Sequence, residues 1–171
     1  MTGLDPEVDK IIEAAVIATD FDLYQIATYQ ATVKQDDKLL TSRMVGGFWD
    51  KHDDSRRGLM AKNSSADAKS SDLVEKELLQ FVHDNFDETQ PIYLAGNSVH
   101  QDRRFIAKAW PELNKIFHYR MLDVSAWKIM FEHFGIRYTK PEAHRALSDI
   151  EGSIGELKYY LKKTKLGEKH D

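Results

Sequence analysis

Two aspartates and a histidine in the second half of the chain have side chains suited to metal-assisted hydrolysis. They are Asp102, His144 and Asp149. Hard divalent cations such as Mg²⁺ and Mn²⁺ prefer carboxylate oxygens, and phosphodiester hydrolysis commonly uses two such ions held by several converging carboxylates. A histidine, which titrates near neutral pH, can take the proton from the attacking water. Taken alone, three scattered residues of these types more often belong to a solvated surface than to a metal site.

The spacing of His144 and Asp149 limits how they can share a site. On an ideal helix, five positions separate two side chains by about 140°. The two residues therefore meet only if His144 lies at or before the start of the helix that carries Asp149. Pro141 supports this arrangement, because proline is tolerated at the start of a helix and disrupts its interior.

Alternating strand and helix patterns must position these residues, and this alternation is typical of an α/β domain. Apolar and β-branched runs predict an antiparallel strand pair over 11–19 and 23–34. The polar stretch 50–71, interrupted by Gly58, predicts a short helical piece and a loop. Farther along, the periodicity predicts helices over 72–86, 101–109, 125–134 and 145–163, and short strands over 92–95 and 119–123.

Residue types at the helix ends predict where these helices start and stop. Asp72 and Glu75 together predict the N-terminal cap of the first of them. Pro111 is expected to stop the helix before it, and Gly135 is a common residue just past a helix C-terminus.

Composition limits the class of protein. Hydrophobic residues make up 42% and charged residues 30% of the 171, which fits one globular domain over 1–163 with a polar tail over 164–171. There is no cysteine, so disulfides and cysteine-ligated metal centres are excluded. No apolar run approaches the roughly 18 residues that span a bilayer. The net charge of −4 argues against binding to long duplexes. A nucleic-acid substrate is expected to be short, or to be bound by metal ions that supply the positive charge.

Three segments in order resemble the oligoribonucleases, which are DEDDh 3′→5′ exonucleases of the ribonuclease H-like fold. The segments are GNSVHQDRRF (96–105), HYRMLDVS (118–125) and HRALSDI (144–150). The first six residues, MTGLDP, resemble the stretch that follows that family's first acidic motif. The resemblance covers nearly the whole chain, and it implies a mixed sheet with flanking helices.

The resemblance also implies roles for individual residues in the hydrolytic step. Asp102 and Asp149 match the third and fourth acidic metal ligands, and His144 matches the general base. The complete family site holds two Mg²⁺ or Mn²⁺ ions.

Other matched residues are implied to bind the substrate. Leu4 matches an apolar wedge against the bases at the 3′ end, and Ser98, Arg120 and Ser125 match the group that captures a 5′ phosphate. Tyr119 matches an aromatic residue that reaches the neighbouring subunit of a homodimer. An arginine fork suits a terminal phosphate, and wedging contacts tolerate any base.

Each of these substrate residues also has a structural alternative. Trp49 matches a family tryptophan but is equally compatible with a buried aromatic anchor. Leu4 could be packing, Tyr119 could belong to the core, Arg120 could be a surface ion-pair partner, and Ser125 could cap its helix.

The Asp-x-Glu motif that supplies the first two acidic ligands in that family is not found in these residues. The strand that carries it is central to the family's sheet, so the first central strand is expected to be missing. Three explanations are open: a sequence that begins at an internal methionine, a genuine short form, or a strand supplied by another chain. We favour the first, because Met1 matches a family residue at that place.

The sequence therefore predicts a 3′→5′ exoribonuclease that degrades short single-stranded RNA, dinucleotides included, to nucleoside 5′-monophosphates. The alternative is a catalytically inactive, truncated form that acts as a nucleotide-binding or interaction module. Partners are expected to be short RNA and a second copy of the chain, without a membrane. The resemblance favours a cytoplasmic or mitochondrial location.

Overall fold

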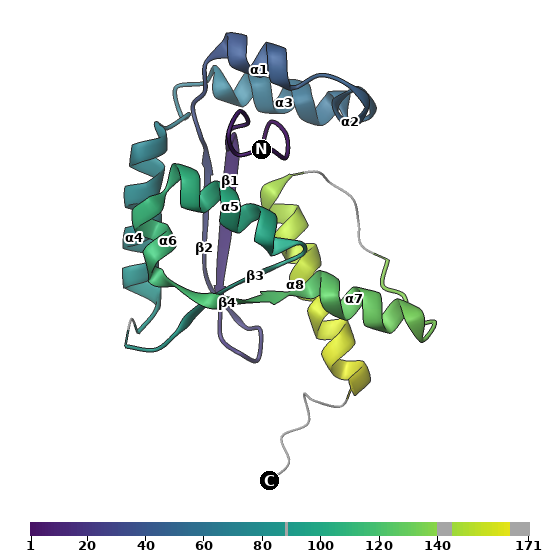
Figure 1. Cartoon of the computed structure of the whole chain (residues 1–171). Coiled ribbons are helices and arrows are strands. Elements are labelled where there is room, and N and C mark those ends of the chain that lie inside the picture. The colour runs from purple at the N-terminus through teal and green to yellow at the C-terminus, as the bar shows by residue number, and fades with distance from the viewer. Residues whose placement is uncertain (88, 140–144, 165–171) are drawn as a thin grey trace.

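The computed structural model describes residues 1–87, 89–139 and 145–164 (Figure 1). Over these ranges, helices flank two small sheets, which confirms the predicted α/β class. Both sheets are two-stranded, so the described residues contain no strand that joins them. The polar tail predicted from residue 164 lies outside the described residues from 165 on, and the single-domain division stays a prediction.

The first sheet is the antiparallel hairpin that the sequence predicts. It pairs β1 (Glu13–Thr19) with β2 (Gln25–Thr32), with Glu13 opposite Thr32. Between the strands, the Asp20 carboxylate accepts a hydrogen bond from the Tyr24 backbone N–H at 2.9 Å and so stabilises the turn. The hairpin thus places Glu13 at the end of the strand that lies farthest from this turn.

The second sheet is parallel and brings the carboxyl ends of its two strands to one edge. It pairs β3 (Ile92–Gly96) with β4 (Phe117–Asp123), and Gly96 lies opposite Asp123. The connection contains α5 (Val99–Ala109) and α6 (Pro111–Ile116). Because the strands are parallel, the residues that follow both carboxyl ends are neighbours, which is where α/β proteins commonly bind ligands.

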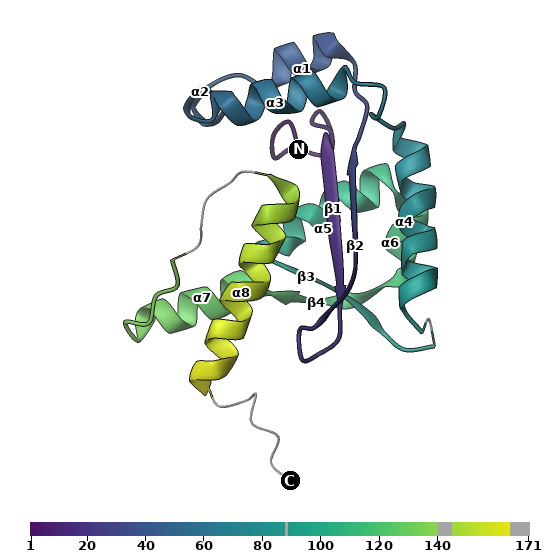
Figure 2. The same cartoon turned by 180° about the vertical axis from the view of Figure 1, so that it is seen from behind.

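Three helices gather beyond one end of the hairpin (Figures 1 and 2). They are α1 (Asp37–Arg43), α2 (Gly47–Lys51) and α3 (Asp53–Asn63). The short helical piece predicted within 50–71 is α3, which continues through Gly58, and the predicted loop follows it over 64–70. Ion pairs from Asp53 to Arg56 and Arg57, three and four positions away, help to hold the first turns of α3.

The remaining helices correct one predicted cap. Their bounds are α4 (Ser71–Asn85), α7 (Val124–His133) and α8 (Ala146–Thr164). The cap of α4 is Ser70, whose hydroxyl accepts the Leu73 N–H, rather than Asp72 with Glu75. Glu75 instead accepts N–H groups of Glu112 and Leu113, so the helix after Pro111 is capped from α4.

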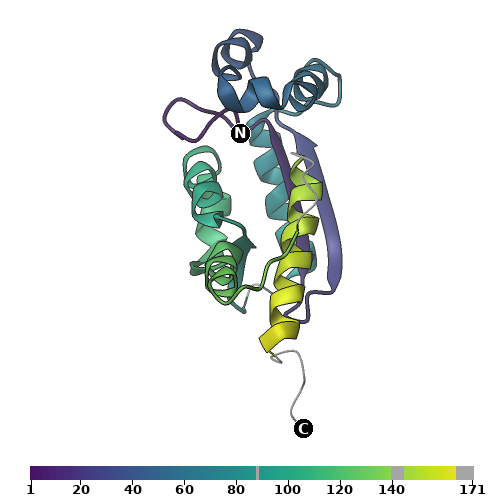
Figure 3. The same ribbon diagram turned by 90° about the vertical axis from the view of Figure 1, so that its right-hand side faces the viewer.

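The apolar core fills the space between these elements. The largest cluster, which includes Val74, Phe105 and Trp110, lies between the hairpin, α4 and the connection after β3. A smaller cluster joins Val124 of α7 to Leu157 and Tyr160 of α8. Figure 3 shows α8 running alongside the hairpin, and its contacts with β1 place it there. No helix in the described ranges is long and apolar enough to cross a bilayer.

Candidate active site

Two of the predicted phosphate-binding residues meet where β3 and β4 end. Ser98 donates its backbone N–H to the Ser125 hydroxyl at 2.8 Å, and the two hydroxyl oxygens are 3.2 Å apart. Ser98 has a left-handed backbone conformation, with φ of 51°, that turns the chain from β3 into α5. The parallel pairing of Gly96 with Asp123 explains why serines 27 positions apart come together.

Asp123 organises this pair of serines. One of its oxygens accepts the backbone N–H groups of both Ser98 and Ser125, each at 2.9 Å. The same carboxylate is the N-cap of α7. Its other oxygen lies 3.6 Å from Nδ1 of His100. The predicted cap role of Ser125 thus belongs to Asp123, and the Ser125 hydroxyl faces Ser98.

Asp102 lies one turn into α5, beyond these serines. Desolvation by the surrounding protein raises the pKa of its carboxyl group, and the charge of Asp123 acts in the same direction. The pKa is lowered in part by a hydrogen bond from its own backbone N–H and by the charges of the Met1 amino group and His100, but it stays above its ordinary value. A carboxylate in such surroundings gains from a nearby cation.

Several carboxylates face the region around the amino group of Met1. Burial lowers the pKa of this amino group, while the negative charges of Asp102, Glu13 and Asp9 act to raise it. Glu13 in turn binds Arg145 and the N–H of Ala146 at the start of α8. The first turns of α5 and α8 therefore border one region beside the first residues of β1.

Asp149 and His144 were predicted on either side of the start of α8. Asp149 lies in its first turn and donates its backbone N–H to the Arg145 carbonyl at 2.9 Å. His144 lies outside the described residues. Within the described ranges, no three aspartate, glutamate, histidine or cysteine side chains converge closely enough to hold a metal ion. The described donors therefore do not make a metal site by themselves.

The loop that carries Leu4 is ordered by buried polar contacts. Leu4 itself is 69% exposed, so it is not core packing. Trp49 is buried among the side chains beneath α1–α3 and donates its ring N–H to the Thr2 carbonyl at 2.9 Å. Trp49 is thus a buried anchor of the Leu4 loop, and its predicted contact with substrate stays a prediction.

Tyr119 and Arg120 lie on β4 and project away from the core. Tyr119 is 72% exposed, which excludes the alternative that it belongs to the core. The Arg120 guanidinium lies over the Tyr119 ring, 5.2 Å from its centroid. The contacts of Arg120 thus connect it to Tyr119, whereas Ser98 and Ser125 are connected through Asp123.

Sequence reasoning missed several residues that hold this region together. Asp123 gives a local signal, because an aspartate directly before a helical pattern is a common N-cap. Glu13 gives none, since its partner Arg145 is 132 positions away. Asn97 donates to Glu156 at 2.8 Å, another contact that spans more than 50 residues.

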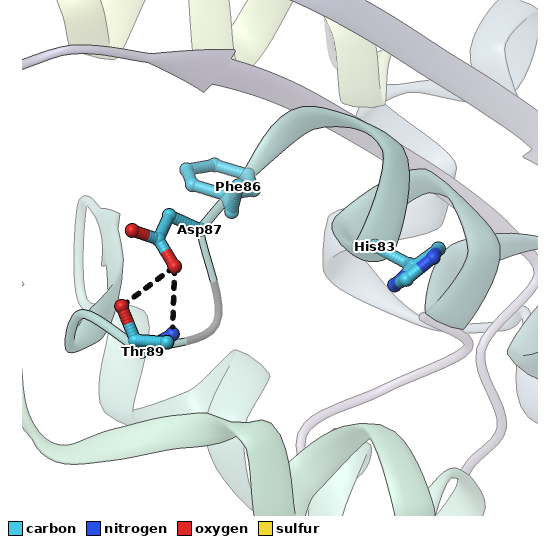
Figure 4. A pocket seen from close by; sticks show the side chains of 4 residues that line it. All are labelled: His83, Phe86, Asp87 and Thr89. Atoms are coloured by element: carbon cyan, nitrogen blue, oxygen red, sulfur yellow. Dashed lines mark hydrogen bonds between the residues drawn. The ribbon is translucent and has the colours of Figure 1, made fainter.

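A surface hollow lies elsewhere, after the end of α4. Figure 4 shows it lined by His83, Phe86, Asp87 and Thr89. The Asp87 carboxylate already accepts the N–H of Thr89 at 3.0 Å and its hydroxyl at 2.7 Å. None of the predicted site residues lines this hollow, so we assign it no part in the site.

Comparisons with known proteins agree on one family. The profile of the exonuclease family RNase T matches residues 1–157. An oligoribonuclease of Thiobacillus denitrificans is 38% identical over 165 residues, which cover 94% of this chain and 88% of that protein. Oligoribonucleases of Francisella tularensis subsp. novicida and Coxiella burnetii are 39% and 40% identical, covering 95% and 94% of this chain and 90% and 87% of theirs.

Proposed function

This chain belongs to the exonuclease family, and we propose that it is a 3′→5′ exoribonuclease that degrades short oligoribonucleotides, including dinucleotides, to nucleoside 5′-monophosphates. The observation that carries the proposal is the meeting of Ser98 and Ser125 under Asp123, beside the helix that carries Asp102. Exposed hydroxyl groups at the ends of parallel strands are suited to a substrate phosphate.

The substrate is held, in this proposal, by residues from three segments. Ser98 and Ser125 bind the 5′ phosphate, with Arg120 as the cationic partner. Leu4 wedges against the 3′ base, which its exposure on an ordered loop allows. A site with a wedge on one side and a phosphate group on the other selects by length, because both contacts are satisfied together only by a short RNA.

The exonuclease family implies dependence on a divalent metal, and we propose Mg²⁺ or Mn²⁺, with two ions in the complete site. Asp102 and Asp149 are the proposed ligands, and His144 is the proposed general base that takes a proton from water. Two carboxylates are too few for two ions, and the described residues contain no further group that completes the site. The proposal for the metal therefore rests on the family and on the chemistry of these side chains.

We also propose that the chain forms a homodimer. Ile129 and Met130 of α7 and Phe134, which caps its C-terminus, are 69%, 58% and 70% exposed. Together with Trp127 and Phe131, the last two line an apolar hollow. Contiguous apolar surface of this kind marks protein interfaces, and Tyr119, exposed on β4, is the residue proposed to reach the partner's site.

A nucleotide-binding or interaction module without catalysis is the second candidate. The observation that favours it is the lack of a metal-binding group among the described side chains. Such a module would keep Leu4, Ser98 and Arg120 for recognition. The proposed location, for either candidate, is the cytoplasm or the mitochondrion.

Turnover of a 5′-phosphorylated, labelled diribonucleotide with Mn²⁺ separates the two candidates. The exonuclease proposal expects release of nucleoside 5′-monophosphates, abolished by Asp102→Ala and lowered about 10²–10⁴-fold by His144→Ala, the usual contribution of a general base. Asp84→Ala, an exposed aspartate on α4, is the matched control and should leave the rate unchanged. Binding without turnover would support the module, and neither binding nor turnover would contradict both.

A further inference from the structure

One buried carboxylate fastens the start of α8 to the start of β1. Glu13 is the first residue of β1, and its side chain is 6% exposed. Arg145 approaches it with two donors: Nε lies 3.2 Å from Oε2, and a terminal nitrogen binds Oε1. The N–H of Ala146, the first residue of α8, also donates to Oε2, at 3.0 Å.

The contact between Glu13 and Arg145 fixes the orientation of the start of α8 as well as its position. Burial opposes ionisation of Glu13, but the hydrogen bonds from Arg145 and Ala146 and the charges of Arg145 and Lys62 hold its pKa below the ordinary value. A planar arginine fork on a carboxylate permits few relative orientations. The carboxylate also satisfies one of the free N–H groups at the start of α8 and favours the positive end of its dipole.

The anchored residues adjoin the proposed chemistry directly. The Arg145 carbonyl accepts the backbone N–H of Asp149, so this aspartate lies one turn beyond the fork. His144 precedes Arg145 in the sequence. A change in the rotation of the first turn of α8 would therefore move Asp149, the proposed metal ligand.

A second buried carboxylate fastens the middle of α8. Glu156 is 1% exposed and accepts hydrogen bonds from Asn97 at 2.8 Å and from the Tyr160 hydroxyl at 2.9 Å. Asn97 follows β3 and precedes Ser98. Because Glu156 already holds the middle of α8 in place, the Glu13 fork has the narrower task of setting its first turn.

We propose that Glu13 is a positioning residue for the exonuclease reaction: through Arg145 it sets the rotation of the first turn of α8, so that Asp149 faces the scissile phosphate. This role rests on the proposed function. Misplacement of reacting groups by about 1 Å can cost about 10²-fold in rate. Loss of the fork should therefore lower kcat while it leaves KM, which depends on the Leu4 and Ser98 contacts, unchanged.

A purely structural ion pair is the competing explanation, and the chain offers a matched control for it. Glu77 on α4 binds Lys69 at 2.7 Å and the Tyr29 hydroxyl at 2.6 Å, also partly buried. This pair lies away from α8. A substitution of Glu77 should reduce stability by a similar mechanism without affecting the orientation of α8.

The test compares Glu13→Gln, Arg145→Lys and Glu77→Gln in the full chain. With a 5′-phosphorylated diribonucleotide, we expect Glu13→Gln to lower kcat about 10²-fold at unchanged KM, and Glu77→Gln to retain kcat. Hydrogen exchange should show faster exchange of the Asp149 amide in Glu13→Gln and not in Glu77→Gln. Arg145→Lys keeps the charge but loses the fork, and it should repeat the kcat loss even if Glu13→Gln folds poorly.

If both Glu13→Gln and Arg145→Lys retained kcat, the positioning role would be overturned and the proposed function would stand. Unchanged protection of the Asp149 amide in these variants would do the same. Absence of turnover by the unaltered chain would instead overturn the proposed function, and the positioning role with it.

Discussion

At the scale of single residues, Asp9 shows how one buried side chain holds the loop that carries Leu4. Its carboxylate, 2% exposed, accepts the Thr2 hydroxyl at 2.9 Å, the Asp5 backbone N–H at 3.0 Å and Nε of Arg43 at 2.9 Å. Burial opposes its ionisation, but the hydrogen bonds from Arg43, Asp5 and Thr2 and the charge of Arg43 hold the pKa of Asp9 below its ordinary value of 3.8. The loop that presents Leu4 is thus fixed before substrate binds.

The depressed pKa of Asp9 predicts a pH dependence of stability. Its contribution is fully present above the ordinary pKa of 3.8 and is lost as pH falls through the lower pKa of the folded state. Asp9→Asn should reduce the free energy of unfolding at pH 7 by about 1–3 kcal/mol, and this difference should shrink below about pH 4. Urea unfolding of the unaltered chain and of Asp9→Asn across pH 3–7 measures this difference and its pH dependence. A difference in the free energy of unfolding that stays constant over this range would contradict a lowered pKa of Asp9.

Arg120 gives a prediction about substrate length. If its guanidinium binds the 5′ phosphate, Arg120→Ala should weaken turnover of 5′-phosphorylated dinucleotides more than that of longer RNA, whose additional contacts compensate. Arg104→Ala is the control, because this exposed arginine on α5 binds only the neighbouring Gln101 in the contacts that the structure describes. Rates measured against lengths of two to seven residues test this, and equal losses at every length would argue against a phosphate clamp.

At the scale of elements, the parallel pairing of β3 and β4 is what assembles the serine pair. Asp123 connects the end of β4, the start of α7 and the turn after β3 through one carboxylate. Its substitution should therefore affect both helix stability and substrate binding.

Asp123→Ala should cost about 1 kcal/mol of stability, the usual value of a helix cap. It should also raise KM, because the backbone N–H of Ser98 loses one of its two acceptors. Asp36→Ala is the matched control, since Asp36 caps α1 by accepting the Leu39 N–H at 3.0 Å far from the serines. Thermal unfolding and steady-state kinetics on both variants separate the effects. A KM increase of the same size in Asp36→Ala would show that lost stability alone explains the result.

Local sequence patterns predicted most elements, and they failed at a helix cap and at a contact between distant residues. The hairpin and the helices over 71–85 and 146–164 follow from residue periodicity. The helical piece predicted within 50–71 is α3, and ion pairs of Asp53 help to carry it through Gly58. The N-terminal cap of α4 was predicted at Asp72, whereas Ser70, two positions earlier, is the residue that caps the helix. The Glu13–Arg145 fork could not be predicted, because nothing in either segment identifies a partner 132 positions away.

At the scale of the whole molecule, α8 holds together elements that the two separate sheets leave apart. It packs along β1, contacts α7 through the cluster around Tyr160, and binds the turn after β3 through Glu156. The opposite face of α7 stays exposed and apolar. This asymmetry is the basis of the homodimer proposal.

Met130→Glu is expected to convert the proposed dimer to a monomer, because it buries an unpaired charge in an apolar interface. Light scattering coupled to gel filtration gives the mass directly. Phe21→Glu, at an 83% exposed position near the hairpin turn, is the control and should stay dimeric. A monomeric unaltered chain at micromolar concentration would contradict the proposal.

The most direct test of the central claim is the product released from a 5′-labelled, 5′-phosphorylated triribonucleotide incubated with the chain and Mn²⁺. A 3′→5′ exoribonuclease yields the labelled dinucleotide first and labelled mononucleotide later, each step releasing an unlabelled nucleoside 5′-monophosphate, and Asp102→Ala and Asp149→Ala both stop the reaction. Labelled mononucleotide appearing first, or cleavage that persists in both variants, would contradict the account.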